Sequence, residues 1–151
     1  MAFHQVKDIM RETCNEHVRV AEYYEEMQDF VAEAKVKSLL EIMYQHEQEM
    51  ILGIRRYLKE GISSTLNTWF QYLPDIPKAS ELIKENLEED ITPEDLVHLI
   101  NKVNQCFIVR YTKFSDICPS TAVKELFSEM IRMEENEGPR EGWNQVMLED
   151  M

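Results

Sequence analysis

The sequence predicts an all-α protein, built as a bundle of four long helices that form two related pairs. Apolar residues recur at steps of three and four over long stretches, which is the period of a helix with one buried face. Four glycines and five prolines in 151 residues favour long helices over a turn-rich β fold. A weaker copy of Ala34–Met50 returns at Thr121–Glu137, so a shift of 87 positions superposes Glu47 on Glu134.

Composition limits the partners and the location of the protein. A formal net charge of −13 argues against nucleic acid and anionic membranes, because both are bound through Lys and Arg. No stretch approaches the roughly 20 apolar residues of a membrane span, and the N-terminus lacks a secretory signal pattern. Cys14, Cys106 and Cys118 form no Cys-x-x-Cys pair. We therefore expect a single domain, residues 1–151, in the cytoplasm, where thiols stay reduced.

The first predicted helix covers about residues 6–31, and the second covers about residues 34–58. His17 fills a gap in the apolar stripe of the first helix, and Glu47 interrupts the stripe of the second. Gly61 is a plausible stop for the second helix. Both polar side chains are therefore expected to point into the bundle.

Residues 61–92 break the helical rhythm and are predicted to form a long crossover. They hold the aromatic residues Trp69, Phe70 and Tyr72, two prolines and a short helix at about residues 78–89. A connection of this length lets the third long helix run parallel to the second. The aromatic residues are expected to cap the bundle or to form a subunit contact, which makes a homodimer possible.

The second helix pair begins with a strong start signal at Thr92-Pro93, where a capping hydroxyl precedes a proline. The third helix is expected to end near Ile117. The fourth is expected to open after Pro119-Ser120 and to stop at Gly138-Pro139. The remaining tail, about residues 138–151, either docks or frays.

Each of the four helices contributes one polar residue to its inner face, and these are His17, Glu47, Asn104 and Glu134. A buried carboxylate is costly unless it is paired, protonated or bound to a cation. Glu oxygens and His nitrogens are suitable ligands for Fe, Mn or Zn. Protonated His17 between the two carboxylates would serve equally well without a metal, and both interpretations stay open.

These residues resemble the ferritin-like superfamily, the four-helix carboxylate bundles that include rubrerythrins and bacterioferritins. The likeness covers about residues 6–137 and includes the pseudo-repeat and the crossover. It also includes an aromatic residue seven positions after the first-helix ligand, since Tyr24 follows His17 by seven and Tyr111 follows Asn104 by seven. The family uses a glutamate from each of two helices and Glu-x-x-His from each of the other two. For an enzyme, the resemblance implies metal-dependent redox chemistry on oxygen or peroxide.

The chain departs from both Glu-x-x-His motifs. Met50 stands where the histidine would follow Glu47, and Glu137 stands where it would follow Glu134. We therefore expect a single ion, held by Glu47, Glu134 and His17. The residues expected to assist or surround this ion are Glu137, Glu16, Asn104, Tyr24, Tyr111 and Met50. Glu16 is included because it could turn inward in place of His17.

His46 and two metal-free functions are also considered from the sequence. His46 points about 100° away from Glu47 on a helix, so it is expected at a helix seam or in solvent. Without a metal, the bundle would serve as an interaction module through Trp69 and Phe70. Alternatively, it would bind a small apolar ligand in a pocket lined by the methionines Met43, Met50, Met130 and Met133. No phosphate-binding loop, hydrolase elbow or zincin motif is present.

Overall fold

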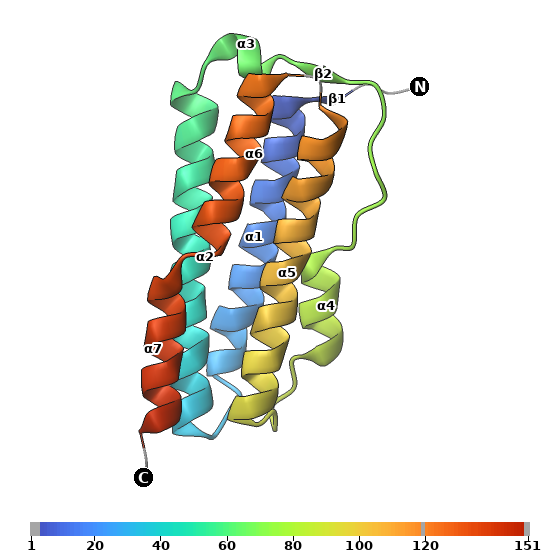
Figure 1. Cartoon of the computed structure of the whole chain (residues 1–151). Helices are drawn as coiled ribbons and strands as arrows, with labels where there is room; N and C mark the ends of the chain where they lie inside the picture. Colours follow the sequence, from blue (N-terminus) through green and yellow to red (C-terminus); the bar gives the residue numbers. More distant parts are fainter. Residues whose placement is uncertain (1–3, 119, 150–151) are drawn as a thin grey trace.

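Helices make up most of the protein, which confirms the predicted all-α class (Figure 1). The computed structural model describes residues 4–118 and 120–149, with the backbone alone at 137 and 138. The elements in chain order are β1 (His4–Gln5), α1 (Val6–Gln28), α2 (Ala34–Glu60), α3 (Ser63–Leu66), β2 (Trp69–Phe70), α4 (Ala79–Asn86), α5 (Pro93–Ile117), α6 (Thr121–Glu134) and α7 (Glu137–Leu148). Among the described residues, no helix combines the length and the apolar character needed to cross a bilayer.

The long helices α1, α2, α5 and α6 lie side by side (Figure 1). α1 and α2 run in opposite directions, and so do α5 and α6. The segment between α2 and α5 passes along the outside of the molecule from one end to the other (Figure 1). As expected for a long crossover, α5 runs in the same direction as α2.

Local signals in the sequence account for several helix ends. Asp8 accepts a hydrogen bond from the backbone N–H of Gln5 at the start of α1 (3.0 Å). Thr92 caps α5 by accepting from the backbone N–H of Asp95 (3.1 Å), and proline follows at the first helical position. α2 stops at the predicted place, with Gly61 as its C-terminal cap. α1 is shorter than predicted, since it ends at Gln28.

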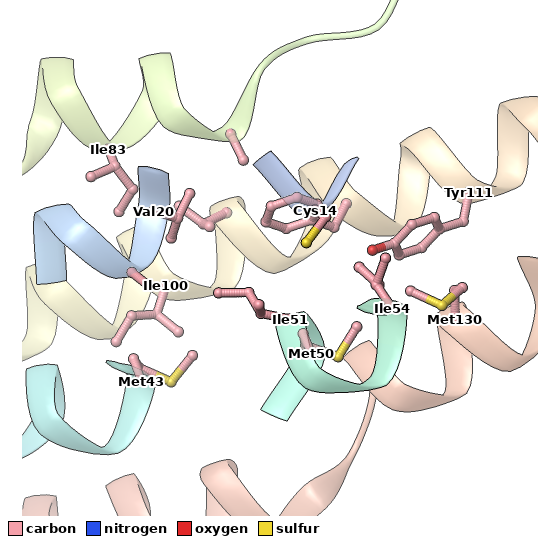
Figure 2. Close-up of a cluster of buried hydrophobic side chains, with 14 of the residues drawn as sticks. Cys14, Val20, Met43, Met50, Ile51, Ile54, Ile83, Ile100, Tyr111 and Met130 are labelled. Atoms are coloured by element: carbon pink, nitrogen blue, oxygen red, sulfur yellow. The ribbon is translucent and has the colours of Figure 1, made fainter. Parts of the chain in front are cut away.

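The predicted apolar stripes meet in the interior. Figure 2 shows Met43 and Met50 of α2 close to side chains from α1, α5 and α6, and the hydroxyl of Tyr111 points into the same interior. Both methionines are at most 1% exposed, and Tyr111 is fully buried. The burial of these helix faces supplies the main driving force for folding.

The crossover closes one end of the bundle. β1 pairs with β2 in an antiparallel ladder, with His4 opposite Phe70. Phe70 is buried, whereas Trp69 and Tyr72 are 57% and 62% exposed. The aromatic cluster therefore divides into a core residue and two surface residues.

The C-terminal region differs from the prediction. α6 ends at Glu134, and Gly138-Pro139 lies in the first turn of a further helix, α7. Proline is tolerated there because the first backbone N–H groups of a helix have no helical partner. α7 packs beside the first half of α2 (Figure 1), and Trp143 and Val146 are buried. The predicted tail is thus a docked helix.

Candidate functional site

An imidazole at the centre of the molecule joins all four long helices. His17 of α1 is fully buried, and its Nδ1 is hydrogen-bonded to Oε2 of Glu47 on α2. Its Nε2 lies 2.9 Å from the hydroxyl of Tyr111 on α5 and 3.1 Å from Oε1 of Glu134 on α6. The ring stacks on Phe107 of α5, with centroids 3.7 Å apart and planes inclined by 8°. We call His17, Glu47, Tyr111 and Glu134 the inner cluster.

Helical periodicity explains how these side chains converge. His17 lies three residues after Cys14 and four before Ala21, both of which are buried on α1. Glu134 is the last residue of α6 and follows Met130 on the same buried face. A side chain placed in an apolar stripe points to the core whatever its polarity. The sequence therefore places two acids and a histidine in the interior, where they pair with one another.

The charges of the inner cluster stabilise one another. Burial by itself would lower the pKa of His17, but the negative charges of Glu47 and Glu134 raise it to about 9. Burial would likewise raise the pKa of Glu134, but protonated His17, followed by His46, lowers it to about 2. His17 is therefore an imidazolium at neutral pH, and it donates from both ring nitrogens. Tyr111 donates to Oε1 of Glu134 over 3.3 Å.

His46 belongs to the site, although the sequence-based analysis placed it at a seam or in solvent. It is 3% exposed, and its Nε2 lies 3.5 Å from Oε2 of Glu134. Burial acts to lower the pKa of His46, but Glu134 and Glu47 outweigh it, so the pKa is raised. His46 thus lies at the seam of α2 with α6 and α7 and not in solvent; its contact with Glu134 was not expected, because the buried face of α2 is wider than one stripe.

The repeat-related counterparts of Tyr111 and His17 are also buried but lack comparable hydrogen bonds. Tyr24 occupies the position equivalent to Tyr111, and Asn104 occupies the position equivalent to His17. Tyr24 is fully buried and Asn104 is 7% exposed. Within the described residues, neither the hydroxyl of Tyr24 nor Oδ1 of Asn104 has a hydrogen-bond partner. Burial and the charges of Glu47 and Glu134 raise the pKa of Tyr24 well above its ordinary value.

The two proposed assisting acids are placed differently. Glu16 is buried but faces α4, where its carboxylate accepts from the backbone N–H (3.3 Å) and hydroxyl (2.9 Å) of Ser80. It also pairs with Arg19 over 3.0 Å. Glu16 therefore anchors the crossover and does not join the inner cluster, because His17 takes the inward position. The side chain of Glu137 lies outside the described residues.

Several buried polar atoms around the inner cluster lack partners in the part of the chain that the structure describes. They are Oε1 of Glu47, Oε2 of Glu134 and both ring nitrogens of His46. Leaving such atoms without hydrogen bonds is costly, so each calls for a physical explanation.

Met50, which was expected near the ion, lies on the same face of α2 one turn after His46 and is 1% exposed.

The part of the chain that the structure describes holds no preformed metal-binding geometry. Among the described residues, no group of three or more His, Cys, Asp or Glu side chains is arranged to hold a metal ion. The reason lies in His17, because both of its nitrogens are already directed at carboxylate oxygens. An ion would therefore compete with a proton at this site.

Comparison of the chain with protein-family models, curated proteins and solved structures finds no match. The ferritin-like resemblance thus depends on the residue pattern alone.

Proposed function

We propose that this protein is a ferritin-like four-helix bundle that binds one Fe, Mn or Zn ion. The ligands are Glu47 and Glu134, together with a nitrogen from His17 or His46. The observation that carries the proposal is the set of buried atoms on Glu47, Glu134 and His46 that have no hydrogen-bond partner among the described residues. Carboxylate oxygens and imidazole nitrogens have the chemistry these ions prefer, and one cation would be ligated by Oε1 of Glu47, Oε2 of Glu134 and one ring nitrogen of a histidine.

The protonation of His17 decides which histidine can ligate a metal ion at this site. Its imidazolium form has no lone pair, so either His17 loses a proton or His46 supplies the nitrogen. Tyr111 then keeps its hydrogen bond to Glu134 and orients that carboxylate. Bound iron or manganese would supply one-electron chemistry on oxygen or peroxide, which is what the resemblance implies.

Thermal unfolding with and without metal tests the proposal. A ligand that binds only the folded state at a hundred times its Kd stabilises it by about 2.7 kcal/mol. Added Zn²⁺ or Mn²⁺ should therefore raise the Tm of the unaltered protein but not of Glu47→Ala with Glu134→Ala. Glu85→Ala with Glu88→Ala removes the same charge from exposed positions and should keep the shift. An equal shift in all three proteins would place the metal elsewhere.

A metal-free role is the second candidate, and one observation favours it. Protonated His17 already lies against both Glu47 and Glu134, so each of these carboxylates has a positive partner without a metal ion. The bundle would then act through its surface. The side chains of Ile62, Trp69 and Tyr72 are exposed along the crossover, and such apolar side chains are suited to a homodimer contact. Light scattering that shows a monomer at high concentration would argue against this role.

The binding of a small apolar ligand is the third candidate, although Met43 and Met50 are buried in the core and do not line a surface groove with the other two methionines. A surface groove of about 620 Å³ lies between α2 and α6, and Met130 and Met133 are among its lining residues. With each of these functions we propose a cytoplasmic location, because Cys14, Cys106 and Cys118 are free thiols.

A further inference from the structure

A surface hollow lies over His46, between α2, α6 and α7. It has two parts, of about 290 Å³ and 570 Å³, which share the lining residues His46, Glu49 and Asn136. The smaller part reaches Arg132 on α6, and the larger part reaches Gly142 on α7. We call both parts together the α7 hollow.

His46 connects the α7 hollow with the inner cluster. It lines both parts of the hollow, whereas His17, Glu47 and Glu134 line neither. On its other side, Nε2 of His46 lies 3.5 Å from Oε2 of Glu134. The side chain is 3% exposed, and neither ring nitrogen has a hydrogen-bond partner among the described residues. The imidazole of His46 therefore lies between the α7 hollow and its ion-pair partner, the buried carboxylate of Glu134.

The charges around the α7 hollow favour a cation. Its one arginine, Arg132, is paired with Glu129 through contacts of 2.6 and 3.0 Å, so these two charges compensate each other. Glu41 and Glu49 are exposed on the rim, and neither has an ion-pair partner among the described residues. A hollow with uncompensated negative charge raises the local concentration of cations and speeds their association.

We propose that a divalent cation reaches the buried carboxylates through the α7 hollow, with His46 as its first protein ligand behind the rim. This inference rests on the proposed metal-binding function. The ion is attracted by Glu41 and Glu49, is bound by a ring nitrogen of His46, and passes to Glu134. Imidazole nitrogen is a suitable ligand for Fe²⁺, Co²⁺ and Zn²⁺, and it binds Mn²⁺ more weakly.

Stopped-flow mixing with Co²⁺, followed by its visible absorption, tests the route. At 0.15 M ionic strength the Debye length is about 8 Å, so only nearby charges influence the association rate. Glu41→Lys with Glu49→Lys should slow association roughly tenfold. The matched control is Glu85→Lys with Glu88→Lys, which makes the same charge change beside a different hollow at α4. The control should associate at the unaltered rate.

His46→Gln provides the second measurement, because it keeps a polar side chain and removes the imidazole. It should slow Co²⁺ association at least tenfold. Equal rates for the rim variant and its control, or an unchanged rate for His46→Gln, would overturn the route while leaving metal binding intact. If the unaltered protein gives no Co²⁺ absorption, the proposed function itself fails, and the route fails with it.

Discussion

Nε2 of His17 and Oε1 of Glu134 lie 3.1 Å apart in the interior, although one residue belongs to α1 and the other ends α6. The same ring is hydrogen-bonded to Glu47 through its other nitrogen. One positive charge thus stands between two negative charges, and all three side chains are almost completely buried. The consequences of this arrangement can be measured with or without a metal.

Removal of His17 should strongly destabilise the metal-free protein. His17→Leu leaves two buried carboxylates without their cation, and breaking a buried pair typically costs about 3–5 kcal/mol. Urea unfolding in the presence of a chelator measures the loss. His98→Leu is the control, because His98 is exposed and should change stability little. A loss below about 1 kcal/mol for His17→Leu would contradict the ion-paired arrangement.

Stability should fall as the pH rises from 6.5 to 9. The pKa of His17 is about 9 in the folded state against an ordinary 6.5. A raised pKa gives stability that is fully present below pH 6.5 and is lost as the pH rises through 9. The shift corresponds to roughly 3 kcal/mol. Urea unfolding at pH 6 and pH 9.5 measures it.

A double substitution tests whether His17 is responsible for this pH dependence. In Glu47→Gln with Glu134→Gln, nothing offsets burial, so the pKa of His17 should fall below 6.5. The loss of stability between pH 6.5 and 9 should then disappear. A slope that survives in this variant would assign it to other groups.

Stability should also fall at low pH, because acid protonates Glu134, the other member of the ion pair with His17. The pKa of Glu134 is lowered to about 2 from an ordinary 4.5, mainly by His17. Its contribution is therefore complete above pH 4.5 and is lost as the pH falls toward 2. Glu134→Gln should unfold with less dependence on pH over this range, as measured by circular dichroism. Identical acid unfolding of both proteins would be inconsistent with a buried, ionised Glu134.

The anchoring of α4 can be separated from the inner cluster. Ser80→Ala removes the hydroxyl that donates to the buried carboxylate of Glu16, which should cost about 1–3 kcal/mol. Ser64→Ala, at an exposed position in the same crossover, should change stability by less than about 0.5 kcal/mol. Neither variant should alter metal affinity. A loss of metal affinity in Ser80→Ala would indicate that Glu16 contributes to metal binding.

The order and type of the long elements could be predicted because each carries an apolar stripe and a local end signal. Thr92 and Pro93 begin α5, and Gly61 ends α2, as their side-chain chemistry requires. The meeting of His17, Glu47 and Glu134 was predicted because each of these polar residues lies in the apolar stripe of its helix. Helix periodicity is a local property, so a single sequence is sufficient to reveal it.

The role of α7 and the place of His46 could not be predicted in the same way. The segment Glu137–Leu148 has few apolar residues, and its docking depends on a surface of α2 that a helical wheel does not identify. Once α6 and α7 cover α2, His46 becomes buried beside Glu134. Its burial is a tertiary effect, and so is the turn of Glu16 toward Ser80.

Elemental analysis of protein purified without chelator, and then exposed to Fe²⁺, Mn²⁺ or Zn²⁺ and desalted, tests metal binding most directly. The account predicts about one equivalent of metal per chain in the unaltered protein. It predicts none in Glu47→Ala with Glu134→Ala, whose helix content by circular dichroism should be unchanged. An unaltered protein that retains no metal, or a double variant that retains as much, would contradict the proposal.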